Sequence, residues 1–235
     1  MAEAGYGSRR ENEKLIEEGH VFVNGKRAIL GTKADPSNDQ IVIDGKKIKQ
    51  ILSKVYIALY KPRGVLSDFD QKDNRTTVKD LIPDYGHLFS VGRLDYDSEG
   101  LILLTNDGEL ANRLTHPRYG HEKEYRVLLS SKPDESQLAT WRRGVVLEDG
   151  YKTAPAKVFI QSSAGKGVWL KIIMKEGKKR QIRETAKQIG LYVEKLIRIR
   201  IGTLEIKAMK AGEWRHLTNS EIDSLKQTTE KNNKR

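Results

Sequence analysis

The amino-acid sequence predicts an α+β protein, in which a small N-terminal module precedes a larger domain with a mixed, largely antiparallel sheet. Two observations support this class. Short apolar runs typical of strands do not alternate regularly with helical stretches, as they would in a parallel-sheet protein. The N-terminal residues, in addition, combine one helical stretch with two tight-turn signals. We expect a module at 1–48, a linker at 49–54, a second domain at 55–225 and a basic, disordered tail at 226–235.

The N-terminal module begins with a helix-start pattern. Ser8 and Glu11 have the spacing of a capping box, and Gly19 can end the helix in a left-handed conformation. Asn24-Gly25 and Asp44-Gly45 each follow a short apolar run, and such pairs favour two-residue hairpin turns because both central residues need a positive φ. The module is therefore predicted to be a helix followed by short, tightly turned strands.

The second domain carries the apolar runs that predict the main sheet. The runs expected to be strands are 55–60, 99–105, 123–129, 156–161 and 168–174. The stretches expected to be helices lie near 107–115, 133–142 and 179–189.

The composition points to a polyanionic partner. The chain has 235 residues, of which 32% are charged, and its formal net charge of +11 favours nucleic acid, although a basic chain can also simply be soluble. There are no cysteines, which excludes disulfides, thiolate nucleophiles and cysteine-ligated metals. The sequence has no apolar run of membrane-spanning length and no signal segment. We expect a soluble cytoplasmic protein.

The most unusual segment is a glycine-flanked loop that holds several acidic residues. Arg93, Asp95, Asp97 and Glu99 precede a buried apolar run. A carboxylate in such a loop can act as a nucleophile or a general base, and a nearby arginine keeps it ionised. An acidic surface turn and an oxygen-ligand metal site are alternatives that the residues leave open, although the spacing does not fit an EF-hand.

A second segment concentrates positive charge. Over residues 171–215 there are 13 Lys and Arg residues against five Asp and Glu residues. Lys178, Lys179 and Arg180 lie next to one another near its start, where they could neutralise RNA phosphates, although a solvated helix face is the alternative. Arg183 lies beside the apolar stripe of the predicted helix and is best placed to turn inward and pair a carboxylate.

Tyr125 lies within a predicted strand, where packing is the commoner role, although a tyrosine can also stack on a flipped base. The five histidines are scattered without metal-ligand spacing, and no glycine-rich phosphate loop is present. We therefore expect no histidine-based metal site and no nucleotide cofactor.

Together these segments resemble the ribosomal pseudouridine synthases, in the group that contains the type A enzymes of small-subunit rRNA and the type B enzymes of large-subunit rRNA. The motifs that carry the resemblance are 60–64, 92–95, 99–108, 123–125, 176–183, 190–191, Leu196, Arg198, 201–202 and 212–215. Residues 1–48 resemble the small RNA-binding domain of ribosomal protein S-four. Runs 5–10 and 108–117 are more similar to the type B, large-subunit rRNA branch.

The resemblance implies a pseudouridine synthase catalytic domain, an isomerase activity, an RNA substrate and no cofactor or metal. By similarity, Asp95 is the catalytic aspartate, Tyr125 stacks on the target base and Arg183 pairs the aspartate. Arg93 is implied to hold RNA or the flipped nucleotide. Arg9 and Arg10 of the N-terminal module are further expected RNA contacts. The partner is expected to be ribosomal RNA or a ribosomal assembly intermediate, bound by a monomer with no role for a membrane.

Two departures from the family pattern stand out. The first helix of the N-terminal module looks truncated, and Glu184 occupies a position where the family often has a basic residue. Three alternatives remain at this point: a small-subunit rRNA synthase of the same family, a non-catalytic RNA-binding assembly factor, and a carboxylate glycosidase. The positive charge and an aromatic content of 7% argue against the glycosidase.

Overall fold

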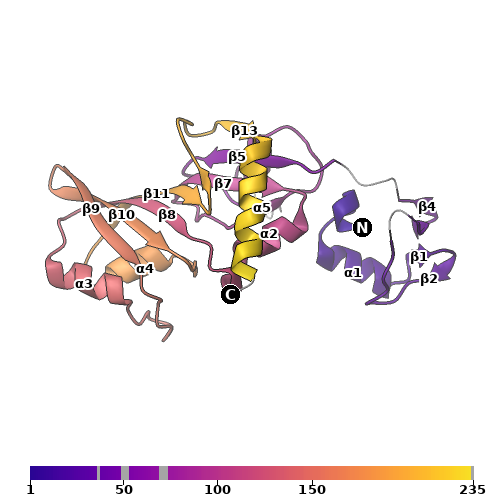
Figure 1. The fold of residues 1–235 in the computed structure, drawn as a ribbon, viewed down its shortest axis with the longest axis horizontal. Helices are drawn as coiled ribbons and strands as arrows, with labels where there is room; N and C mark the ends of the chain where they lie inside the picture. Colours follow the sequence, from indigo (N-terminus) through magenta and orange to yellow (C-terminus); the bar gives the residue numbers. More distant parts are fainter. Residues whose placement is uncertain (36–37, 49–52, 69–73, 234–235) are drawn as a thin grey trace.

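The computed structural model describes residues 1–35, 38–48, 53–68 and 74–233 (Figure 1). The expected linker at 49–54 therefore lies largely outside the described residues. The N-terminal unit contains helices η1 (Ala2–Ala4) and α1 (Arg9–Glu17), and a four-stranded antiparallel sheet in the order β2-β1-β3-β4. Its strands are β1 (Val21–Val23), β2 (Lys26–Arg27), β3 (Ile41–Ile43) and β4 (Lys46–Lys47).

The turn and cap predictions for this unit are confirmed. Ser8 accepts from the backbone N–H of Glu11, and the Glu11 carboxylate accepts from that of Ser8, which completes the capping box. Asn24 and Gly25 have φ values of 51° and 76°, and Asp44 and Gly45 have values of 49° and 75°. Both hairpins therefore use turns in which both central residues lie in the left-handed region.

The second unit is built on one nine-stranded sheet. Seven strands form the main path β13-β5-β7-β11-β8-β10-β9, while β6 pairs with β7 and β12 pairs with β11. The strands are β5 (Tyr56–Lys61), β6 (Phe89–Val91), β7 (Glu99–Thr105), β8 (Lys123–Leu129), β9 (Lys157–Ala164), β10 (Gly167–Met174), β11 (Val193–Ile201), β12 (Leu204–Glu205) and β13 (Trp214–His216).

Only the β7–β11 pairing is parallel among these strand pairs of the described residues; the others are antiparallel. The mixed, largely antiparallel sheet expected from the sequence is thus confirmed. The helices of this unit are η2 (Val78–Leu81), α2 (Gly108–Thr115), η3 (Pro117–Tyr119), α3 (Glu135–Arg143), α4 (Gln181–Gln188) and α5 (Asn219–Asn233).

The sheet divides its helices into two groups. Leu138 and Trp141 of α3 and Ile182 of α4 pack with buried residues of β8 and β10 in one apolar cluster. Leu110 of α2 and Leu225 of α5 belong to another cluster, which also covers β5 and β7. Figure 1 shows this arrangement, with α5 (yellow) beside α2 and with α3 and α4 at the opposite end of the sheet. The strands between the two helical groups carry the candidate site.

The tail expected to be disordered from residue 226 onward is instead helical as far as Asn233. Helix α5 continues to that residue, and Thr229 is buried. The prediction was wrong because it rested on the polar composition of this segment alone. Leu225, just before the segment, is fully buried against α2, and this packing stabilises the helix that continues into it.

In the described part of the chain, every helix is too short or too polar to cross a membrane.

Candidate active site

The acidic loop between β6 and β7 is held by hydrogen bonds to its backbone. The Ser67 hydroxyl donates to the Leu94 carbonyl (2.7 Å), and the Leu94 N–H donates to the same hydroxyl oxygen (3.0 Å). The Ser98 N–H closes a turn by donating to the Asp95 carbonyl (3.0 Å). The buried Leu94 side chain anchors the loop from below. Asp95 is therefore presented from a fixed backbone.

Arg198 supports the same loop from the neighbouring strand. Its guanidinium donates to the carbonyls of Leu101 (2.8 Å), Gly92 (2.7 Å) and Arg93 (3.3 Å), and the residue is only 1% exposed. Burial lowers the pKa of Arg198, while its interactions with the Tyr125 phenol oppose that shift. The buried Arg198 guanidinium thus joins the loop to β7 and β11.

Lys61 is a second buried cation next to the loop. Its ammonium donates to the carbonyls of Ser98 (2.8 Å) and Pro62 (2.9 Å), and the side chain is completely buried. Burial lowers the pKa of Lys61 to about 8, and the nearby charge of Asp95 opposes this shift. Sequence reasoning included Lys61 and Arg198 in motifs but gave neither a role; a basic residue inside an otherwise apolar strand is the signal that could have found them.

These elements surround a cavity of about 570 Å³ that brings together most of the predicted site residues. From the prediction it contains Arg93, Asp95, Tyr125, Lys178, Lys179 and Arg180. It also contains the basic residues Lys123, Lys175 and Arg198, which the prediction did not include. A carboxylate and an aromatic ring thus share a cavity whose other charged groups are mostly cations.

Asp95 is half-buried, and its carboxylate makes no hydrogen bond or ion pair with any described residue. Tyr125 lies on β8 opposite Arg198 of β11, and it is only 7% exposed. Its ring packs in the apolar cluster that includes Leu94, the residue before Asp95. The carboxylate is therefore uncommitted, while the ring beside it is fixed by packing.

Arg183 lies elsewhere than the sequence suggested. It does not line the cavity, and its guanidinium donates to the backbone carbonyls of Val193 (2.9 Å) and Asp97 (3.1 Å). Burial and the charge of Arg180 lower the pKa of Arg183, while the charges of Asp97 and Asp95 oppose this shift. Arg183 therefore joins the Asp97 carbonyl of the loop to the Val193 carbonyl of β11, and it forms no ion pair with the Asp95 carboxylate.

The remaining predicted cations of the cavity lie at its rim. Arg93 is 74% exposed at its side chain and pairs with Asp68 at 3.5 Å. The Lys178 ammonium lies 3.9 Å from the centre of the Tyr151 ring, and Lys179 is exposed. Arg180 lies 3.6 Å from Asp97 and 3.9 Å from Glu184. Glu184, the departure noted in the sequence, thus takes part in the ion pairing of the rim.

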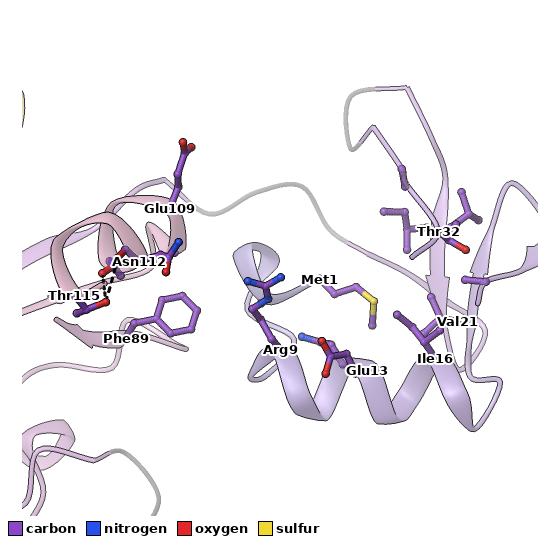
Figure 2. A pocket seen from close by; sticks show the side chains of 18 of the residues that line it. Met1, Arg9, Glu13, Ile16, Val21, Thr32, Phe89, Glu109, Asn112 and Thr115 are labelled. Carbon is purple, nitrogen blue, oxygen red and sulfur yellow. Dashed lines mark hydrogen bonds between the residues drawn. The ribbon is translucent and has the colours of Figure 1, made fainter. Parts of the chain in front are cut away.

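Arg9 and Arg10 are exposed at the start of α1 and do not line this cavity. Arg9 lines a second cavity of about 870 Å³, together with residues of α1 and α2 (Figure 2). This larger cavity contains Glu13, Phe89, Glu109 and Asn112, but neither Asp95 nor Tyr125. The larger cavity therefore holds neither the Asp95 carboxylate nor the Tyr125 ring; both line the smaller one.

Within the residues that the structure describes, no three His, Cys, Asp or Glu side chains cluster as metal ligands would.

The chain matches two family models. Residues 55–188 match RNA pseudouridylate synthase, and residues 1–41 match the S4 domain. It is 42% identical over 228 residues to an uncharacterized RNA pseudouridine synthase of Aquifex aeolicus, with 96% of this chain and 91% of that protein covered. It is 41% identical over 230 residues to ribosomal large subunit pseudouridine synthase B of Bacillus subtilis, with coverage of 96% and 93%.

The corresponding protein of Escherichia coli K12 is 38% identical over 243 residues, which cover 98% of this chain and 81% of that protein. Among solved structures, the crystal structure of a pseudouridylate synthase matches with a TM-score of 0.68 and 30% identity, covering 95% of this chain and 96% of that one. The similarity therefore extends over both units.

Proposed function

The chain belongs to the RNA pseudouridylate synthase family, as the resemblance of its motifs predicted, and on this premise we propose that it converts a specific uridine of large-subunit ribosomal RNA to pseudouridine. The choice of large-subunit RNA rests on the names of the relatives that match nearly the whole chain. The main structural support for this chemistry is the position of the Asp95 carboxylate. It lines a cation-rich cavity together with Tyr125 and has no partner among the described residues.

The reaction is an isomerisation, so its atoms balance within the nucleotide. The bond between N1 of uracil and C1′ of ribose breaks, the base turns, and C5 bonds to C1′; the C5 proton is lost and N1 gains a proton. Asp95 acts next to the anomeric carbon, either as the nucleophile that holds the sugar or as the base that takes a neighbouring proton. Both routes need an ionised carboxylate.

The target base has to leave its stack, at a cost of about a few kcal/mol. Tyr125 offsets part of this cost by stacking on the flipped uracil, since its ring is already held by packing. Arg183 is a positioning residue in this proposal: it holds the backbone of the Asp97 turn, and with it the orientation of Asp95.

The RNA backbone is proposed to cross the rim formed by Arg93, Lys178, Lys179 and Arg180. Arg9 and Arg10 extend the basic surface in the N-terminal unit, which matches the S4 domain. We further propose that the protein acts as a cytoplasmic monomer, on ribosomal RNA or an assembly intermediate, without a cofactor or metal.

The decisive experiment measures pseudouridine formation in a large-subunit rRNA transcript with purified protein. Asp95→Asn is expected to lower the rate by about 10²–10⁴-fold or more, while RNA affinity survives. Asp97→Asn is the matched control: it removes a carboxylate two residues away that does not line the cavity, and it is expected to remain active. Full activity of Asp95→Asn would overturn the role of Asp95.

Three further measurements on the purified protein distinguish the alternative functions. Modification of a small-subunit transcript instead of a large-subunit one would assign the other branch of the family. RNA binding by the wild-type protein without any pseudouridine formation would favour an assembly factor. Hydrolysis of a model glycoside would favour a glycosidase.

A further inference from the structure

Lys123 is a buried cation with no part in the proposed chemistry of Asp95 and Tyr125. It begins β8, is 8% exposed and lines the cavity that contains Asp95. Within the described residues its ammonium has no hydrogen-bond or ion-pair partner, in contrast to Lys61, which is held by two carbonyls. A charge removed from water without compensation is costly, so its retention indicates an anion that is present only part of the time.

The groups around Lys123 do not supply that anion. The charge that acts on it is Arg198 of β11, which is repulsive. The adjacent carboxylates, Glu122 and Glu124, are paired with other cations: Glu122 with Lys157 and Arg200, and Glu124 with Lys171 and Arg200. Burial, with a contribution from Arg198, lowers the pKa of Lys123 to about 8. Near neutral pH the cavity therefore contains a protonated, uncompensated lysine.

Its place on the strand indicates which anion it meets. Lys123 and Tyr125 are two residues apart on one face of β8, so their Cα atoms are separated by about 7 Å along the strand. A base stacked on the Tyr125 ring would present its edge to the Lys123 ammonium. A phosphodiester, by contrast, remains joined to neighbouring nucleotides and would stay near the exposed cations Arg93 and Lys179 at the rim.

We propose that Lys123 is a catalytic residue that donates a hydrogen bond to a carbonyl oxygen of the uracil and stabilises the negative charge of the base when the glycosidic bond breaks. The inference rests on the proposed function. When the N1–C1′ bond breaks, its electron pair remains with the base and spreads over N1 and the two carbonyl oxygens, while the sugar carbon is left to Asp95. The charge on the base disappears again when C5 bonds to C1′, and Lys123 keeps its proton throughout.

This role is that of an oxyanion donor, placed where charge develops and shielded from water. It also accounts for the absence of a permanent partner among the described residues, since a carboxylate bound to Lys123 would cancel the field that the leaving base needs. The ground-state uracil is neutral, so Lys123 contributes little to RNA affinity and much to the rate.

The experiment compares Lys123→Met and Lys123→Arg with wild type in single-turnover reactions on the same rRNA transcript. Lys123→Met is expected to lower the rate at saturating enzyme by about 10²-fold, with RNA Kd changed by less than about threefold. Lys123→Arg, which keeps the charge, should recover part of the rate. Lys157→Met is the matched control, because Lys157 is exposed on β9, pairs with Glu122 and lies outside the cavity.

A pH profile of kcat/KM provides a second readout. If the Lys123 ammonium is the donor, the wild-type rate falls as pH rises through about 8, and Lys123→Arg remains active at higher pH. The pKa of Lys61 is also lowered to about 8, but Lys61 is present in both proteins. The difference between the wild-type and Lys123→Arg profiles therefore reports on Lys123. Superimposable profiles would overturn the proposal.

Stability and salt dependence separate the remaining outcomes. Removing an uncompensated buried charge is expected to leave the melting temperature of Lys123→Met unchanged or higher, so a large loss of stability would indicate a structural role and overturn the proposal. A weaker Kd with a salt slope reduced by about one would assign Lys123 to a phosphate instead. If the wild-type protein is inactive on rRNA transcripts, the proposed function fails. If the wild type is active and Lys123→Met is equally fast, only the inference about Lys123 fails.

Discussion

At the residue scale, the candidate site is organised by buried cations that bind backbone carbonyls. Arg198 joins the carbonyls of Gly92, Arg93 and Leu101, and Lys61 joins those of Ser98 and Pro62. Because these cations use carbonyls as partners, they hold the loop without occupying its carboxylates. The Asp95 carboxylate is thereby left without a partner among the described residues, in a positively charged surrounding.

His121 is a residue whose environment predicts a pH dependence of stability. It is 3% exposed, and both ring nitrogens are buried without a hydrogen-bond partner among the described residues. Burial, with a contribution from Lys123, lowers the pKa of His121 from its ordinary value of 6.5. The folded protein keeps this histidine neutral, whereas the unfolded chain takes up a proton near pH 6.5, so stability is lost as pH falls below that value.

His121→Phe removes the titrating group and both unpaired nitrogens. We expect it to raise the free energy of unfolding by about 1 kcal/mol at pH 8, and to flatten the decline of stability below pH 6.5. Chemical denaturation between pH 5 and pH 8 measures both effects, at about 25 °C. An unchanged slope in the variant would show that His121 binds its proton equally in the folded and unfolded states, which would contradict the argument.

At the element scale, the parallel pairing of β7 and β11 brings the acidic loop and its arginine together. Arg198 lies opposite Gly100 in this pairing, and Gly100 has a φ of 113°. A side chain at Gly100 would place its Cβ 2.3 Å from the Arg198 carbonyl oxygen. The close approach of the two strands therefore requires glycine at this position, both for the conformation and for the space.

Gly100→Ala is expected to destabilise the protein by about 3 kcal/mol or more and to lower activity, since the clash falls on backbone and cannot be relieved by a rotamer change. Gly150→Ala is the matched control: its φ is 80°, but no atom lies within 4 Å of the added Cβ. It should cost only about 1–2 kcal/mol, from the left-handed conformation alone. Thermal or urea unfolding measures both variants, and equal losses would contradict the strand-contact argument.

At the scale of the whole molecule, exposed positive charge occurs both at the cavity rim and in the N-terminal unit. The net charge of +11 is consistent with RNA as the partner of this family, and Arg9 and Arg10 are exposed at the start of α1. Contacts to phosphates outside the cavity should contribute to affinity and not to the chemical step.

The double variant Arg9→Ala/Arg10→Ala tests this division. Its RNA affinity is expected to fall, and the slope of log K against log salt to decrease by about 0.7–0.9 for each lost phosphate contact. The single-turnover rate at saturating enzyme should match wild type. Lys157→Ala, which removes an exposed charge from β9, serves as the control for net charge. An unchanged salt slope would remove these two arginines from the RNA interface.

Local patterns account for what the sequence predicted well. The Ser8–Glu11 capping box, the Asn24-Gly25 and Asp44-Gly45 turns, and strands β7 and β8 depend on neighbours in the chain and were all correctly placed. Strand β11 was missed, because Glu194, Lys195 and Arg198 interrupt its apolar run. The pairing of β11 with β8 has register shifts at 193–195 and 198–200, and each shift breaks the alternation of buried and exposed residues that a strand prediction depends on.

The sequence by itself determined the α+β class, the family, the basic character and the positions of Asp95 and Tyr125 in ordered motifs. Only the tertiary structure decided which side chains meet in the cavity. It brought Lys123 into the cavity that contains Asp95, buried Arg198 under the loop, and turned Arg183 toward the Val193 and Asp97 carbonyls instead of the Asp95 carboxylate. The physical reason is that a motif specifies residue type and order, whereas the partner of a charged group depends on strand order and on the carbonyls that burial leaves within its reach.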